Sequence, residues 1–393
     1  MNRLTRRKQC LIRYPVGRTV GLHGIHRFAS CSILGAMVAG LLLPANEARA
    51  QSSVQLYGIV DGALTYTTNI KGGHAWAQSS GVARNDRWGF RGVEDLGGGY
   101  QAIFRLENGF SINNGTLGQG GLEFGRQAYV GLASDRMGTV TLGRQYDFMT
   151  SNLSAFSAGS LIPSVFAFHL GDLDRLGGER INNAVKYVTP TLAGLQLGGF
   201  YAFGGQPGDF VTNSASSFGA TYAQGPLHLA AAYTAIHNFQ ATFGIGTSVL
   251  GTQLSGSGAL GTLSTPPTFD KLVVSGVAAG YQLGAVSLQG LFTLVDFQNH
   301  GQSSVLRTGE GNAQYKVSAA VMLAASYAYS KLDGEHWNQI AVGADYILSS
   351  RTDLYLNAVY LRASSGVTAE LFLLSPSSSN TQTIVSLGLR HTF

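Results

Sequence analysis

The chain has 393 residues, of which 12% are charged and 53 are glycine, whereas about 25% of the residues in a typical soluble domain are charged. The net charge of +5 comes from residues 1–50, which hold eight of the 26 Lys and Arg residues and one of the 21 Asp and Glu residues. The rest of the chain is close to neutral, so its overall charge gives no reason to infer a patch that binds nucleic acid. No run of 18 apolar residues follows residue 50, which excludes a membrane-spanning helix there.

Residues 1–50 have the parts of a secretory signal. A basic opening precedes the short apolar run SILGAMVAGLLLP, and the small-x-small motif ARA follows at 48–50. The apolar run is shorter than the roughly 20 residues that a spanning helix needs. We therefore predict a signal peptide over 1–50 and one domain over 51–393. Cys10 and Cys31 both fall in the signal, so the domain contains no disulfide.

Apolar and polar residues alternate with period two along most of the domain. In VQLYGIVDGALTY (54–66), one face carries Val54, Leu56 and Leu64, and the other carries Asp61. The ending IVSLGLRHTF alternates in the same way to Phe393. Each strand thus has one apolar face and one face with ionised groups. A water-filled barrel suits this pattern better than a packed core, because burying unpaired charge is costly.

Short and long connections alternate along the chain. Tight turns are predicted at 94–99, 134–138, 189–194, 223–227, 281–285, 315–320 and 348–353. Longer polar connections are predicted at 67–83, 111–121, 146–179, 204–215, 237–270, 297–311 and 364–381, with a short one near 332–336. Fifteen connections imply sixteen strands, with both termini on the same side. In a closed barrel the last strand must pair with the first, which explains a chain that alternates to its final residue.

Two of the long connections differ in character. Segment 237–270 is rich in Gly, Ser and Thr and is predicted to be a mobile surface loop. Segment 146–179 contains the apolar stretch LIPSVFAF and ends in the charged run GDLDRLGGERINN. We expect this second loop to pack against another part of the molecule.

Several stretches resemble the Gram-negative trimeric porins, specifically their β-proteobacterial general diffusion type. They are SSVQLYGIVDGALTY, DRWGFRGVEDLGGGYQAIFRLENGF, RQAYVGLASDRMGTVTLGRQYD, RINNAVKYVTPTLAGLQLGGFY and the ending GLRHTF. The resemblance implies an all-β, 16-stranded antiparallel transmembrane β-barrel whose third loop folds inward and narrows a pore. It also implies a homotrimer, and a C-terminal Phe393 read by the barrel-assembly machinery. The family has an aromatic residue where this chain has His391.

The resemblance places basic residues on the pore wall at Arg87, Arg144 and Arg180, by match to the family's R-x-G-F, G-R-x-Y and R-I-N-N positions. Strand parity favours Arg87 and Arg180, whereas Arg144 needs either a bulge at Gly143 or the end of the strand to face inward. Further candidates on the lumen face are Arg91 and Arg105. A structural alternative is that these arginines only neutralise wall carboxylates such as Glu107 or Asp61.

Acidic candidates on the inward loop are Asp147, Asp172, Asp174 and Glu179. The PEFGGD motif of enterobacterial porins is absent, so the sequence does not fix which acid faces the pore. Cations on the wall opposite acids on the loop would set up a transverse field. The alternative is a solvated external cluster of charges.

The resemblance predicts an outer-membrane diffusion channel that selects small hydrophilic solutes and ions by size and charge. The arginines favour anions. We expect contacts with outer-membrane lipid and lipopolysaccharide, both termini facing the periplasm, and no nucleic acid, metal or cofactor. An alternative is a channel specific for an organic acid or a sugar. Two others are a barrel enzyme, for which Ser164 with His169 is the best available pair, and a structural tether or adhesin.

Overall fold

A computed structural model describes residues 52–256 and 261–393. The predicted signal peptide, with Cys10 and Cys31, lies outside the described residues. Within them, no helix has the length and apolar character needed to span a membrane.

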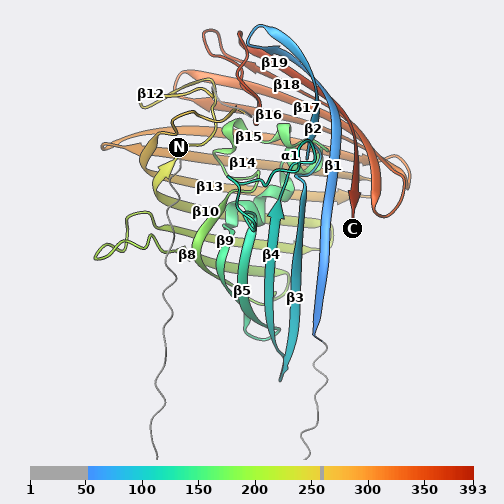
Figure 1. Ribbon diagram of the computed structural model, residues 1–393, viewed down its shortest axis with the longest axis vertical. Coiled ribbons are helices and arrows are strands. Elements are labelled where there is room, and N and C mark those ends of the chain that lie inside the picture. The colour runs from blue at the N-terminus through green and yellow to red at the C-terminus, as the bar shows by residue number, and fades with distance from the viewer. Residues whose placement is uncertain (1–51, 257–260) are drawn as a thin grey trace, which may run out of the picture. The chain divides into compact units, whose positions relative to one another are not determined.

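The described residues form a closed antiparallel barrel (Figure 1). The strands of its wall are β1 (Ser53–Ile70), β2 (Gly73–Ser80), β3 (Arg87–Gly97), β4 (Tyr100–Gly109), β5 (Gln127–Ser134), β6 (Gly138–Tyr146), β7 (Arg180–Val188), β8 (Leu195–Ala202), β9 (Ala215–Gln224), β10 (Leu227–Gln240), β13 (Thr268–Leu283), β14 (Val286–Asn299), β15 (Gln302–Lys316), β16 (Val321–Leu332), β17 (Glu335–Ile347), β18 (Thr352–Ala363) and β19 (Thr381–Thr392). Both β2 and β3 pair with β1, one along each half of its length. Counted together as one interrupted strand, they give sixteen strands in the described wall, which confirms the sequence prediction.

Pairing of the last strand with the first closes the wall. Strand β19 pairs with β1 from Ile59 opposite Thr392 to Thr67 opposite Ile384. Gly58 and Phe393 then exchange two backbone hydrogen bonds of 3.0 Å. A Cβ atom at Gly58 would lie 2.3 Å from Cζ of Phe393 and 2.7 Å from the backbone oxygen of Arg87, so a glycine is required where the terminal ring crosses β1.

Neighbouring residues of the wall meet different surroundings. On β1, the side chain of Leu64 is 63% exposed on the outer surface, whereas its neighbours Ala63 and Thr65 are 4% and 3% exposed. On β19, Leu387 is 56% exposed and Ser386 is fully buried. The predicted alternation therefore corresponds to an outer apolar face and an inner polar face.

Two of the predicted long loops are wrong. Segments 67–83 and 297–311 are largely paired strands, with tight turns at 71–72 and 300–301. Both segments are polar, and polar strand ends that extend beyond the apolar band look like loops in sequence. Segment 237–270 also differs from the prediction. It contains a hairpin of β11 (Thr247–Val249) and β12 (Thr252–Leu254), with Val249 and Leu254 buried.

The third loop, residues 147–179, folds into the barrel and packs along its inner wall. Figure 1 shows its short helices enclosed by the strands. They are η1 (Met149–Leu153), η2 (Ser154–Phe156), α1 (Ala158–Leu161), η3 (Val165–Ala167) and η4 (Leu170–Asp172). Wall amides bind the loop's carbonyl oxygens: Asn312 donates to Phe156, Gln314 to Leu161 and Gln339 to Ala167, at 2.8–2.9 Å. These bonds satisfy backbone groups that irregular structure would otherwise leave unpaired.

Glycines on the wall make room for the start of this loop. The ring of Phe148 is 3% exposed and rests on β8 and β9. A Cβ atom at Gly198 would lie 2.0 Å from Cζ of Phe148, and one at Gly219 would lie 2.6 Å from its Cδ1. Any larger side chain at Gly198 would displace the ring, so the loop's position is coupled to two glycines about 50–70 residues away in sequence.

A buried histidine fixes the last part of the loop, residues 169–179, to the wall; we call this part the return arm. His169 Nδ1 lies 2.5 Å from Oδ2 of Asp174 on the same loop, and Nε2 lies 2.9 Å from Oε2 of Glu310 on β15. Thr293 donates to Asp174 at 2.8 Å, and the backbone N–H of Ala158 donates to Glu310 at 2.9 Å. We call this group the histidine clamp (His169, Asp174, Glu310, Thr293).

The clamp depends on the charge of His169. Burial by itself would lower the pKa of His169, but the charges of Asp174 and Glu310 and their hydrogen bonds raise it well above 6.5. A histidine whose pKa is raised in the folded state adds stability that is fully present below its unfolded pKa. That stability is lost as the pH rises through the folded pKa. The loop should therefore be held firmly at neutral pH and released under alkaline conditions.

We predict that His169→Gln loosens the loop at neutral pH. Removing one member of a buried ion pair costs about 3–5 kcal/mol, so protection of loop amides from hydrogen exchange should fall by at least about a hundredfold. In the unaltered protein, the same loss should appear only at alkaline pH.

The matched control is His237→Gln. His237 bonds to Ser214 at 3.3 Å and makes no ion pair within residues 52–256 and 261–393. Equal loop protection in the unaltered protein and in both variants at pH 7 would contradict the clamp.

Candidate functional site

Arginines gather on the inner wall where β3 to β7 approach the inward loop. Arg87 begins β3, Arg144 lies near the end of β6, and Arg180 begins β7. Arg87 lies close enough to Arg126 and Glu107 for their charges to interact, and Arg144 interacts in the same way with Arg180. We call Arg87, Arg126, Arg144 and Arg180 the basic wall.

A tyrosine hydroxyl joins two members of the basic wall. Tyr146 accepts hydrogen bonds from Nη2 of Arg126 at 3.1 Å and from Nη2 of Arg180 at 3.0 Å. The Arg180 guanidinium also lies 5.0 Å from the centre of the Tyr146 ring. Arg126 donates in addition to Glu107 at 2.8 Å. The sequence analysis missed Arg126 and Tyr146, because both stand at strand ends where alternation no longer defines a face.

Arg144 is positioned by the irregularity that its inward placement requires. Gly143 has a φ of 137°, and the pairing of β6 with β7 shifts register between Gly143 and Gln145. Arg144 donates to the carbonyl of Gly125 at 2.7 Å and to Oδ1 of Asn182 at 2.6 Å. Both bonds hold the guanidinium near the end of the strand, beside Arg180.

Arg91 and Arg105 lie nearer the short-turn end of the wall. They are directly opposite each other on β3 and β4. Their guanidiniums lie 5.5 Å and 5.7 Å from the centre of the Tyr57 ring, and Arg91 also binds Gln55 at 2.6 and 2.9 Å. This pair therefore forms a second basic layer below Arg87.

Three of the four predicted loop acids are buried within the loop. Asp147 is fully buried and pairs with Arg175, and Asp174, 2% exposed, belongs to the histidine clamp. Asp172 is 4% exposed, and burial raises its pKa well above the usual value, with Asp174 and Glu179 adding to the effect. Only Glu179 is partly exposed. The structure thus gives the loop little negative charge to set against the arginines.

Small hydroxyl side chains cover part of the loop surface instead. Ser151, Ser154 and Ser160 line a cavity of about 550 Å³ between the loop and the wall. Arg84, from the segment between β2 and β3, and Arg390 of β19 line the same cavity. Arg390 is bridged to Asp345 at 3.2 Å and to Asp353 at 2.9 Å. Arg84 and Arg390 are further cations that the sequence analysis did not identify.

The remaining candidates are a catalytic pair, a metal site and the C-terminal residues. Both ring nitrogens of His169 face carboxylates, and no hydrogen bond joins it to Ser164 among the described residues, so this pair lacks the arrangement of a nucleophile and its base. Within the same residues, no group of three His, Cys, Asp or Glu side chains is arranged to hold a metal ion. At the C-terminus, Phe393 and His391 lie on the outer face, and His391 Nδ1 is 2.9 Å from the hydroxyl of Thr352.

Comparison with known proteins agrees with this architecture. The sequence model of the Gram-negative porin family matches residues 35–366. An outer membrane porin protein of Bordetella pertussis is 29% identical over 402 residues, covering 92% of this chain and 99% of that protein. Outer membrane porin protein 32 of Delftia acidovorans is 29% identical, covering 90% and 97%.

Solved structures give the same result. The anion-selective porin from Comamonas acidovorans aligns with a TM-score of 0.72 and 25% identity, over 87% of this chain and 100% of that one. Salmonella typhi OmpF shares the fold, with a TM-score of 0.60 and 16% identity over 86% and 97%. A closed barrel with an inward third loop and a family match along most of its length lead to one conclusion: this chain belongs to the Gram-negative porin family and forms a multi-pass β-barrel diffusion channel of the bacterial outer membrane.

Proposed function

We propose that this porin passes small hydrophilic solutes and ions with a preference for anions, and that the basic wall sets the preference. The observation that supports it is an imbalance of charge. Four guanidiniums are grouped on the wall, against three nearby acids. These are Glu107, which binds Arg126, the buried Asp86, whose charge interacts with that of Arg87, and Glu179, which is partly exposed. The loop carboxylates Asp147, Asp172 and Asp174 are buried. The constriction is therefore positive rather than balanced across the pore.

The size of the effect follows from Coulomb's law. A unit charge 4 Å from a permeating ion contributes about 1 kcal/mol in bulk water and about 4 kcal/mol at the effective dielectric near a protein surface. Salt screens exposed charges, with a Debye length of about 10 Å at 0.1 M. Arginine suits this role because it stays ionised beside other cations. The structural neighbour from Comamonas acidovorans is itself described as anion-selective.

We predict that Arg87→Ala combined with Arg180→Ala weakens the anion preference. In planar bilayers under a KCl gradient, the reversal potential should shift toward that of potassium. The change in permeability ratio should be at least about fivefold, since each lost charge is worth about 1 kcal/mol or more.

The matched control removes the same formal charge from exposed turns, with Arg136→Ala and Arg351→Ala. Its reversal potential should stay at the unaltered value. A shift of equal size in the control, or no shift in the double wall variant, would refute the role of the basic wall.

We further propose a homotrimer in contact with outer-membrane lipid and lipopolysaccharide, with both termini facing the periplasm. The resemblance of the sequence to trimeric porins supports this assembly. Closure of single insertions in three equal current steps would test it in the same recordings, and closure in one step would count against it.

We also propose that the exposed ring of Phe393 is read by the barrel-assembly machinery. Phe393→Ala keeps the backbone bonds to Gly58 but removes the ring, so we predict less protein in the outer membrane of an expressing bacterium and unchanged refolding in detergent. Leu389→Ala, which truncates another outward side chain of β19, is the control. Equal outer-membrane amounts of the two variants would remove the ring from the signal.

A further inference from the structure

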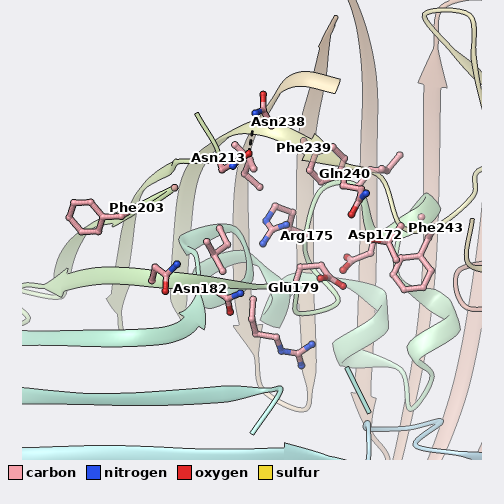
Figure 2. Close-up of a pocket in the computed structure, with 18 residues that line it drawn as sticks. Asp172, Arg175, Glu179, Asn182, Phe203, Asn213, Asn238, Phe239, Gln240 and Phe243 are labelled. Atoms are coloured by element: carbon pink, nitrogen blue, oxygen red, sulfur yellow. Dashed lines mark hydrogen bonds between the residues drawn. The ribbon is translucent and has the colours of Figure 1, made fainter. Parts of the chain in front are cut away.

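A cavity of about 460 Å³ lies at the end of the barrel that carries the long connections, which we call the loop end. It is bounded by the return arm of the third loop, the first residues of β7 and the end of β10 (Figure 2). Its volume falls within the roughly 300–1,000 Å³ typical of small-molecule sites. It is distinct from the serine-lined cavity on the other side of the loop, with which it shares no lining residue.

Side-chain amides dominate the polar lining. Asn182, Asn213, Asn238 and Gln240 come from three separate parts of the chain. Asn238 donates to Asn213 at 3.0 Å, as Figure 2 shows, and Asn182 accepts from Arg144. Because each amide offers both donors and acceptors, hydrogen-bonding capacity of both kinds remains around the cavity. Gln240 is exposed, and its side chain makes no hydrogen bond that the structure records among the described residues.

Buried charged groups add unsatisfied capacity beside these amides. Arg175 is 5% exposed, yet its Nη2 atom has no hydrogen-bond partner within the described chain, and the same holds for Oδ2 of Asp172. Both side chains line the cavity. Figure 2 places Arg175 and Asp172 together with Glu179 around the central space, whereas Phe203 points away from it.

The backbone around the cavity is held in an uncommon conformation. Asp172, Arg175, Asn183, Asn213 and Asn238 all have a φ between 49° and 66°. Left-handed residues other than glycine carry a conformational cost, and they cluster at ligand-binding sites. Here they bend four chain segments toward a single cavity.

The charges of the lining nearly cancel. Arg175 is neutralised by Asp147 in a buried ion pair. Burial and its acidic neighbours raise the pKa of the Asp172 carboxyl, which disfavours its charged form. Arg180 and Glu179 remain, with opposite sign. The lining itself thus carries little net charge, and its amides and the aromatic Phe239 and Phe243 suit a solute with hydroxyl edges and apolar C–H faces.

We propose that this cavity binds a neutral polyhydroxylated solute, a mono- or disaccharide, at the loop end of the channel. The inference rests on the proposed function: a solute of this class would bind transiently in the cavity before it passes the constriction. Hydroxyl groups pair with amides both as donors and as acceptors, and a site built around them discriminates strongly against solutes that lack them.

Maltose is the probe for the first test. Added to the loop side of single channels in planar bilayers, it should interrupt the ion current in a saturable way, with half-saturation at millimolar concentration. Asn182→Ala and Gln240→Ala should each raise the half-saturating concentration by about two- to tenfold, the equivalent of one net hydrogen bond. Gln302→Ala, an exposed glutamine at the start of β15 outside the cavity, should leave it unchanged.

Titration calorimetry with maltose and detergent-solubilised protein tests the site without any current. Heat that saturates in the unaltered protein and weakens in both cavity variants supports the proposal even if the channel conducts no ions, a result that would refute the proposed function alone. The inference is overturned if maltose neither binds nor interrupts the current. It is also overturned if the cavity variants match Gln302→Ala, or if succinate rather than maltose binds in a way that depends on Asn182 and Gln240.

Discussion

Hydrocarbon on the outer side of the wall is the constraint on which the rest of this structure depends. An unpaired backbone N–H or C=O group in lipid costs several kcal/mol, so the wall must be a closed sheet without edges. Closure explains why Phe393 pairs with Gly58 instead of fraying. It also fixes the alternation of side chains, since every second residue faces lipid and the others face the interior. The interior is then free to carry charge, which a packed core would not accept.

Inside this frame the third loop behaves as a packed element. Its aromatic start rests on two glycines of the wall, and its return arm is held by the histidine clamp. Two carboxylates of the loop form internal ion pairs: Asp174 binds His169, and Asp147 binds Arg175. Because these carboxylates are buried in the packing of the loop, they leave little negative charge on its surface.

Much of the wall could be predicted from sequence because its signals are local. Period-two alternation identified the faces, and the length and composition of 146–179 identified a loop that packs. Polar strand ends were misassigned as loops at 67–83 and 297–311, since alternation fades where both faces meet water. In the site, strand parity favoured Arg87 and Arg180 as wall residues. Parity gave no prediction for Arg126 and Tyr146, because both lie at strand ends, where alternation no longer defines a face. The burial of the loop acids could not be predicted from local signals. Asp174 binds His169, and the second partner of His169 is Glu310, 141 residues away.

The central claim is that adjacent residues of one strand meet two solvents, hydrocarbon outside and water inside. Leu323 on β16 is 44% exposed on the outer face, and Ala324 lines the serine-lined cavity. Spin labels at these two positions, in protein reconstituted into lipid vesicles, measure the surroundings directly. The label at 323 should be relaxed by oxygen dissolved in the bilayer, and the label at 324 by a water-soluble nickel chelate. Two labels that both respond to oxygen alone, or that both respond to neither reagent, would contradict a water-filled channel.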